Sequence, residues 1–251
     1  MILTLNKKCF LKILCYELRR ALLNRLFPGL LLVNGLYAWF LLSYDIVLGT
    51  AYTAPFSVWS YCTYLGRALP VAAVTVLLML SNYYSRKQKQ VEVLTAATPV
   101  PPFSQVLIRT LAAGSCFLLI CLVEIALSLL FYIQFFRFHD FAAFILPTLL
   151  LILPCFILIN GLGQLLGSLH RSLIYALMLP VLALHSIPGV FDLFGAGYFS
   201  TVPLTLPVGA DGEPAFTVSA AFTATRLSYA ALGIACICLT TVLSARKSRK
   251  A

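Results

Sequence analysis

The chain has 251 residues, of which 61% are hydrophobic and only 10% are charged, and its formal net charge is +10. Soluble domains carry about 25% charged residues, so the composition excludes a water-soluble globular protein and predicts an all-α integral membrane protein. The positive charge does not indicate nucleic acid as a partner, because the basic residues lie at the edges of apolar runs, where they set membrane topology.

The N-terminal segment, residues 1–27, is predicted to form a cytoplasmic amphipathic helix that lies in the membrane interface. Its charged residues recur every few positions, which excludes a cleavable signal peptide. Pro28 is expected to end this helix, because proline lacks the amide hydrogen. The apolar positions with near-helical spacing are Cys9, Phe10, Ile13, Leu14, Leu18, Leu22 and Leu26.

A helix needs about 20 apolar residues to cross a bilayer, and six stretches meet this length. They make up a predicted six-span domain over residues 28–245, followed by a basic cytoplasmic tail at 246–251. The fourth and fifth stretches are joined only by GSLHRS, so they are expected to be antiparallel neighbours. A long outer loop at about 191–225 is apolar enough to predict short helices or turns at the outer leaflet. The six stretches are about 28–48, 66–84, 107–135, 141–166, 172–190 and 227–245.

The lysines and arginines predict the orientation. With both termini in the cytoplasm, 15 of the 18 basic residues lie on the inner side, and only Arg67, Arg137 and Arg226 lie on the outer side. This arrangement follows the positive-inside rule and predicts a multi-pass protein of the plasma membrane.

One acidic residue, Glu124, lies near the middle of the third predicted span. A charged side chain there costs roughly 2.5–3.5 kcal/mol on insertion scales, and such residues usually face an interior or a cavity. Two interpretations remain open from the sequence. Glu124 lines a substrate conduit, or it is a protonated glutamate that bonds to a neighbouring helix through Asn34 or Asn160.

The glycine-rich run GLGQLLGSLH, residues 161–170, lacks the lysine of a phosphate-binding loop. Gly163 and Gly167 form a small-xxx-small pair that predicts close helix packing. No nucleotide-binding, HExxH or GxSxG motif is present, so we expect no enzymatic activity and no cofactor in this chain. No metal site is expected either, because the spacing of the candidate ligands matches no known pattern; these are His139, Asp140, His185 and Asp192.

The segment VEVLTAATPVPP follows the basic run SRKQKQ and lies on the predicted cytoplasmic side. Glu92 and Leu94 suit a short helix over about 91–100, and Pro99 and the prolines after it end that helix. Such a helix is either a rigid lever held between two spans or an ordinary loop that turns the chain around.

The order of these segments resembles the membrane subunit of type-2 ATP-binding-cassette (ABC) exporters, the ABC-2 type transporter permease family. Within residues 85–112, Glu92, Leu94, Pro99 and Val100 match the family's core, and Arg109 stands where a lysine is common. The resemblance implies that the 91–100 helix, with Leu94 and Thr95 on its apolar face, couples the chain to a separate ATPase subunit that binds ATP. It also implies a second permease chain, identical or homologous, and surrounding membrane lipid.

Two other functional classes fit the same topology. An intramembrane enzyme would need a cluster of polar side chains within the bilayer, for which Asn34, Glu124 and Asn160 are the only candidates identified. A non-transporting membrane protein, such as an immunity or assembly factor, would share the spans and would not depend on an ATPase.

Overall fold

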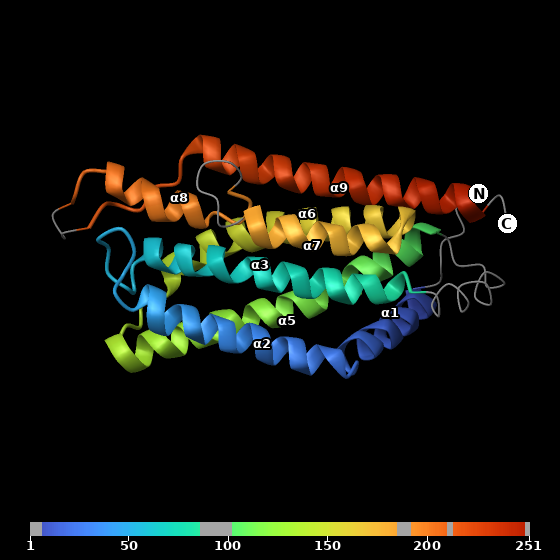
Figure 1. The fold of residues 1–251 in the computed structure, drawn as a ribbon, viewed down its shortest axis with the longest axis horizontal. Coiled ribbons are helices and arrows are strands. Elements are labelled where there is room, and N and C mark those ends of the chain that lie inside the picture. The colour runs from blue at the N-terminus through green and yellow to red at the C-terminus, as the bar shows by residue number, and fades with distance from the viewer. Residues whose placement is uncertain (1–6, 86–101, 185–191, 210–212, 249–251) are drawn as a thin grey trace.

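The computed structural model describes residues 7–85, 102–184, 192–209 and 213–248. Over these residues the protein is an elongated bundle of helices (Figure 1), as the composition predicts. The described residues form no β-strand, and their only bridge between extended segments pairs Val208 with Pro214. The all-α class predicted from the sequence is therefore confirmed over these residues.

Among the described residues, five helices are long and apolar enough to cross a membrane. Two of them are extended at one end by a short turn that is not α-helical. The helix α2 runs on into a π-helical turn, η1, and α6 is preceded by a 3₁₀ turn, η2. The elements are α2 (Leu26–Leu41) with η1 (Leu42–Ile46), α3 (Val58–Tyr83), α5 (Pro102–Phe136), η2 (Ala142–Phe144) with α6 (Ile145–Leu169), and α9 (Ala220–Ser248).

The predicted fifth span does not reach membrane-crossing length over its described residues. The helix there, α7, covers Arg171–Leu184, and residues 185–190 of the predicted span lie outside the described residues. At 1.5 Å per residue, 14 residues extend about 21 Å, short of the roughly 30 Å hydrocarbon core. The structure thus supports five spans, and the sixth stays a prediction.

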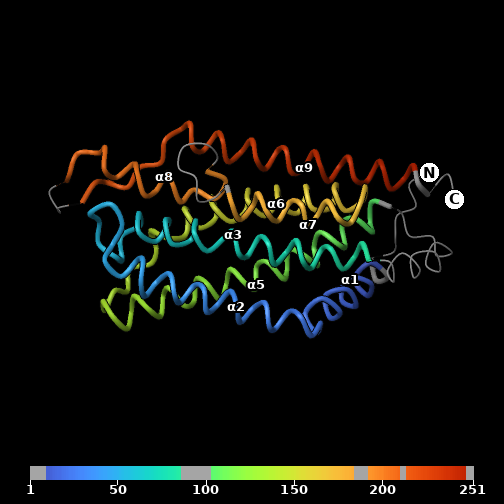
Figure 2. The backbone as a smooth tube through the Cα atoms, viewed as in Figure 1, coloured from blue at the N-terminus to red at the C-terminus, as the bar shows by residue number. Residues whose placement is uncertain are grey.

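The N-terminal helix α1 (Lys7–Leu22) packs against α5. Figure 2 shows that it meets α2 at an angle, and the bend falls just before Leu26. The prediction that Pro28 ends the first helix is wrong. Pro28 lies inside the first turn of α2, where its missing N–H breaks no helical hydrogen bond.

The helix α3 is the centre of the bundle, and it contacts α2, α5, α6, α7 and the short helix α8 (Ala196–Thr201). It begins at Val58 and not at Gly66 as predicted, because Ser57 caps it: the Ser57 hydroxyl accepts a hydrogen bond from the Ser60 amide at 3.2 Å. Its first turns are buried, including Trp59 and Tyr61.

The bundle has two chemically different ends. The basic end holds α1 and its junction with α2, the last turns of α3, α6 and α9, and the first turns of α5 and α7. The capped end is covered by residues 192–209 and 213–219, which we call the cap and which contain α8 and the 3₁₀ helix η3 (Val202–Thr205). The sequence places short helices or turns in this loop, but the loop ends earlier than predicted, because α9 begins at Ala220.

Candidate functional site

Glu124 lies on the buried side of α5 and is 1% exposed. Buried residues recur along this side at helical spacing. The helix α3 contacts α5 here, because the Tyr64 hydroxyl donates to the Glu124 backbone carbonyl at 2.8 Å. Other large side chains of α5 are exposed on the outer side of the helix, among them Leu118, Leu122 and Leu130. The buried positions of this side are Phe117, Ile120, Cys121, Glu124, Ser128, Phe131 and Tyr132.

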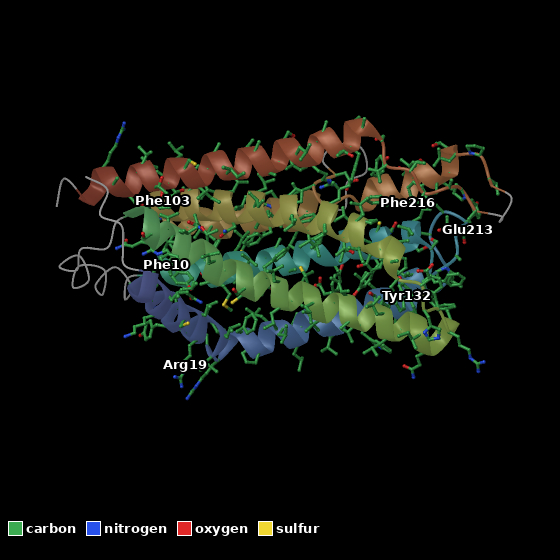
Figure 3. The ribbon with its side chains drawn as sticks, turned by 180° about the vertical axis from the view of Figure 1, so that it is seen from behind. Phe10, Arg19, Phe103, Tyr132, Glu213 and Phe216 are labelled. Carbon is green, nitrogen blue, oxygen red and sulfur yellow. The ribbon has the colours of Figure 1, made fainter. Side chains whose placement is uncertain are left out.

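Neither carboxyl oxygen of Glu124 has a hydrogen-bond partner among the residues that the structure describes. The Tyr132 hydroxyl, two turns further along α5, is also buried without a described partner (Figure 3). Burying an unpaired polar group costs free energy. Glu124 therefore destabilises the fold compared with an apolar residue of similar size, which makes it a candidate for a functional rather than a structural residue.

Asn34 on α2 forms hydrogen bonds with residues other than Glu124. Its side-chain amide donates to the Leu30 carbonyl at 2.7 Å and to the Thr75 hydroxyl of α3 at 2.9 Å. The Thr75 hydroxyl in turn donates to the Val71 carbonyl at 3.0 Å. Asn34 thus links α2 to α3, and no described hydrogen bond joins it to Glu124.

Asn160 on α6 belongs to a polar chain that sequence reasoning missed. Gln164, one helical turn further on and fully buried, donates to the Asn160 side-chain oxygen at 3.1 Å and to the Thr110 hydroxyl of α5 at 2.7 Å. The Tyr84 hydroxyl donates to the Gln164 backbone carbonyl at 3.1 Å. This network ties α3, α5 and α6 together, and the spacing of Asn160 and Gln164 was the available signal for it.

Gly163 and Gly167 lie where α6 approaches α3. A Cβ atom at Gly163 would lie 2.8 Å from the Leu77 side chain, and one at Gly167 would lie 2.4 Å from the Tyr84 ring. A second close contact, between Gly161 on α6 and Gly233 on α9, was not predicted. A Cβ atom at Gly161 would lie 2.3 Å from the Gly233 carbonyl oxygen, so the backbones of these helices meet directly.

Arg226 is a buried cation at the capped end. It is 1% exposed, and its guanidinium donates to the backbone carbonyls of Leu193 and Asp192, the latter at 3.0 Å. The guanidinium carbon also lies 4.4 Å from the centre of the Phe222 ring and 5.7 Å from that of Tyr229. Arg226 therefore fixes the start of the cap to α9.

Further contacts hold the cap on the bundle. The Glu213 carboxylate accepts from the Ala54 amide at 2.7 Å, and the Trp59 indole donates to the Pro214 carbonyl at 3.1 Å. The Phe216 ring packs edge-on against Trp59, with 4.9 Å between centroids. Figure 3 shows Glu213 and Phe216 at this end of the molecule.

Two further charged residues at this end, Asp192 and Arg67, have structural partners. The Asp192 carboxylate accepts from the amides of Gly195 at 2.8 Å and Tyr198 at 2.6 Å, which caps α8. Arg67, expected to lie at the outer interface, forms an ion pair with Asp45. Over the described part of the chain, no group of three metal-binding side chains occurs; His185 lies outside it.

The predicted coupling residues Glu92, Leu94, Thr95, Pro99 and Val100 lie outside the described residues. Their attachment points are described. The helix α3 ends at Tyr83 and α5 begins at Pro102, and both ends lie at the basic end of the bundle (Figure 1).

No protein-family model matches the chain, and the comparisons with curated proteins and with solved structures found no match. The part of the chain that the structure describes is helical and has five helices of membrane-crossing length, which indicates a multi-pass membrane protein.

Proposed function

We propose that the chain is the permease subunit of an ABC exporter, which forms a conduit for substrate and depends on a separate ATPase subunit. The observation that carries the proposal is the position of the segment whose sequence resembles the coupling helix of that family. Residues 86–101 join α3 to α5 at the basic end, and α3 is the most central helix of the bundle. A force applied to this segment would pass directly into α3 and α5.

The charge distribution supports an orientation with this end in the cytoplasm, where an ATPase would be accessible. Arg19, Arg20, Arg25, Arg109, Arg171 and Arg246 all belong to the helices or helix ends that form the basic end. The capped end has Arg67 and Arg226, which are engaged by Asp45 and by the cap, and Arg137. Under the positive-inside rule, both termini are then cytoplasmic and the cap lies outside.

Glu124 supports a conduit in the third predicted span. It lies where α5 is hydrogen-bonded to α3 through the Tyr64 hydroxyl, and these two helices flank the coupling segment. Its carboxyl group is buried and has no described hydrogen-bond partner. An intramembrane enzyme is less well supported, because Asn34 and Asn160 are bound to Thr75 and Gln164 and are not assembled around Glu124.

The proposal is tested by purifying the tagged chain from its native host and measuring how much ATPase co-purifies. Leu94 is the largest apolar side chain of the predicted lever, and burying a leucine contributes about 1.5–3 kcal/mol. Leu94→Asp should therefore reduce ATPase recovery roughly ten-fold or more at equal membrane levels.

The matched control is Ala96→Asp, which adds the same charge to the opposite face of the predicted helix and should retain the ATPase. Equal recovery with both variants would show that the segment is only a turn. Absence of any ATPase, even after crosslinking, would favour the non-transporting immunity or assembly protein.

A further inference from the structure

A groove of about 290 Å³ lies between the end of α1 and the last turns of α3. It is at the basic end of the bundle and opens to the surface, since Arg20 on its rim is an exposed residue. Its lining combines a guanidinium, two amides and a phenol with two apolar side chains. The lining residues are Arg20, Ala21, Asn24, Met79, Asn82 and Tyr83.

The polar members of this lining suit a phosphate group. A guanidinium presents N–H donors in a fork that matches phosphate oxygens, and the amides of Asn24 and Asn82 are additional donors. Arg20 also lies 3.6 Å from Glu17, one helical turn earlier. The Arg20 side chain is 41% exposed and that of Glu17 is 17% exposed, so a phosphate in the groove would share the five N–H donors of the guanidinium with the Glu17 carboxylate.

The surroundings of the groove are apolar. Leu23 and Leu26 flank Asn24 in the sequence and are 70% and 58% exposed. They continue into α2, whose outward side chains Leu32 and Leu36 are also exposed. A ligand whose phosphate occupies the groove would therefore have apolar protein surface beside it, which suits an amphiphile and not a small water-soluble anion.

The amphipathic character of α1 places the groove at the depth of the lipid headgroups. Arg19 and Arg20 lie in its last turn, and α2, which follows directly, is one of the helices of membrane-crossing length. Helices of this type bury their apolar face at the boundary of headgroup and acyl chain. The polar lining and the headgroup phosphates would then lie at the same level.

We propose that this groove binds the phosphate of a membrane glycerophospholipid, with Arg20 as the main ligand and the acyl chains lying along Leu23, Leu26 and α2. The bound lipid would join α1 to α3, independently of whether the chain is a permease.

The full-length chain, purified in detergent, is mixed with phosphatidylglycerol and bound lipid is counted by native mass spectrometry. Arg20→Gln removes the fork of donors and should weaken binding about ten-fold, the value of one charge-assisted contact. The matched control is Arg19→Gln, which removes the same charge from the neighbouring position. Arg19 does not line the groove, and Figure 3 shows its side chain extending away from the bundle.

Asn82→Leu fills the groove from α3 and should also weaken binding, which keeps the test informative if Arg20→Gln unfolds the chain. Equal losses for Arg19→Gln and Arg20→Gln would overturn the proposal, because they would indicate only general attraction between basic residues and anionic lipid. Displacement of the lipid by glycerol phosphate at equal concentration would also overturn it, since the site would then recognise a free phosphate.

Discussion

Two buried ionisable residues, Glu124 and Arg226, are equally inaccessible, each 1% exposed, yet they are held in opposite ways. Arg226 donates to two backbone carbonyls and lies against two aromatic rings. Glu124 has no described partner for either carboxyl oxygen. Arg226 thus joins α9 to the cap, whereas the Glu124 carboxyl group does not stabilise the fold.

The difference indicates that the capped end and the middle of α5 have different roles. At the capped end, Arg226, Trp59 and Glu213 fasten the cap to the helices. The middle of α5 instead carries a carboxyl group that is free of such contacts within the described structure. If the roles differ in this way, substitutions at the two residues should affect different properties.

The largest loss of stability is expected for Arg226→Met. It removes the guanidinium and leaves the partly buried carbonyls of Asp192 and Leu193 without this donor, at up to roughly 1–3 kcal/mol for each group that stays unsatisfied. Thermal unfolding of the purified chain in detergent should show a clear drop in midpoint, and protease should cleave the cap faster. The matched control is Arg137→Met, an exposed arginine, which should leave both unchanged. An unaltered midpoint in Arg226→Met would contradict the anchoring described here.

The contact between α6 and α9 should show the next largest effect. Gly161→Ala or Gly233→Ala introduces a Cβ atom 2.3 Å or 2.4 Å from a backbone oxygen of the facing helix. Overpacking of this kind costs about 1–3 kcal/mol, so the unfolding midpoint should fall. Gly29→Ala, for which no atom lies within 4 Å of the added Cβ, should be neutral or stabilising because alanine favours the helix. The same response at all three positions would mean that α6 and α9 do not meet as described.

Glu124 should show the smallest effect on stability and a distinct effect on function. Glu124→Gln keeps the shape and removes the ionisable group, and Glu124→Met also removes the cost of an unpaired buried polar side chain. Both variants should unfold at or above the wild-type midpoint, and Glu124→Gln should lose transport at unchanged membrane abundance. A Gln variant that transports normally would retire the conduit interpretation, since glutamine retains most hydrogen bonds of a protonated glutamate.

The sequence predicts the interior of the long helices well and their ends poorly. Residues 58–65 are rich in aromatic side chains, and the second predicted span begins only after them, at residue 66. In the structure Trp59, Tyr61 and Cys62 are buried in the first turns of α3. The aromatic content of a segment does not tell whether it faces lipid headgroups or the cap of the same chain.

The start of α9 was missed for a related reason. Arg226 looked like the edge of a span, because an isolated arginine is costly inside a membrane. Its partners are carbonyls of Asp192 and Leu193, more than thirty residues earlier in the chain, and no local pattern reveals them. The same holds for Gly161 and Gly233, whose contact exists only once α6 and α9 are packed. Glu124, in contrast, could be identified from the sequence because a single acid in an apolar run is conspicuous by itself.

The central claim is that the segment between α3 and α5 transmits force from an ATPase. The most direct measurement places a photo-crosslinking amino acid at Leu94 in cells and identifies the captured protein by mass spectrometry. The account predicts capture of a protein that contains a phosphate-binding loop, with no such product from the same probe at Leu118, an exposed apolar position on α5. Capture of no ATPase from Leu94, or equal capture from both positions, would contradict it.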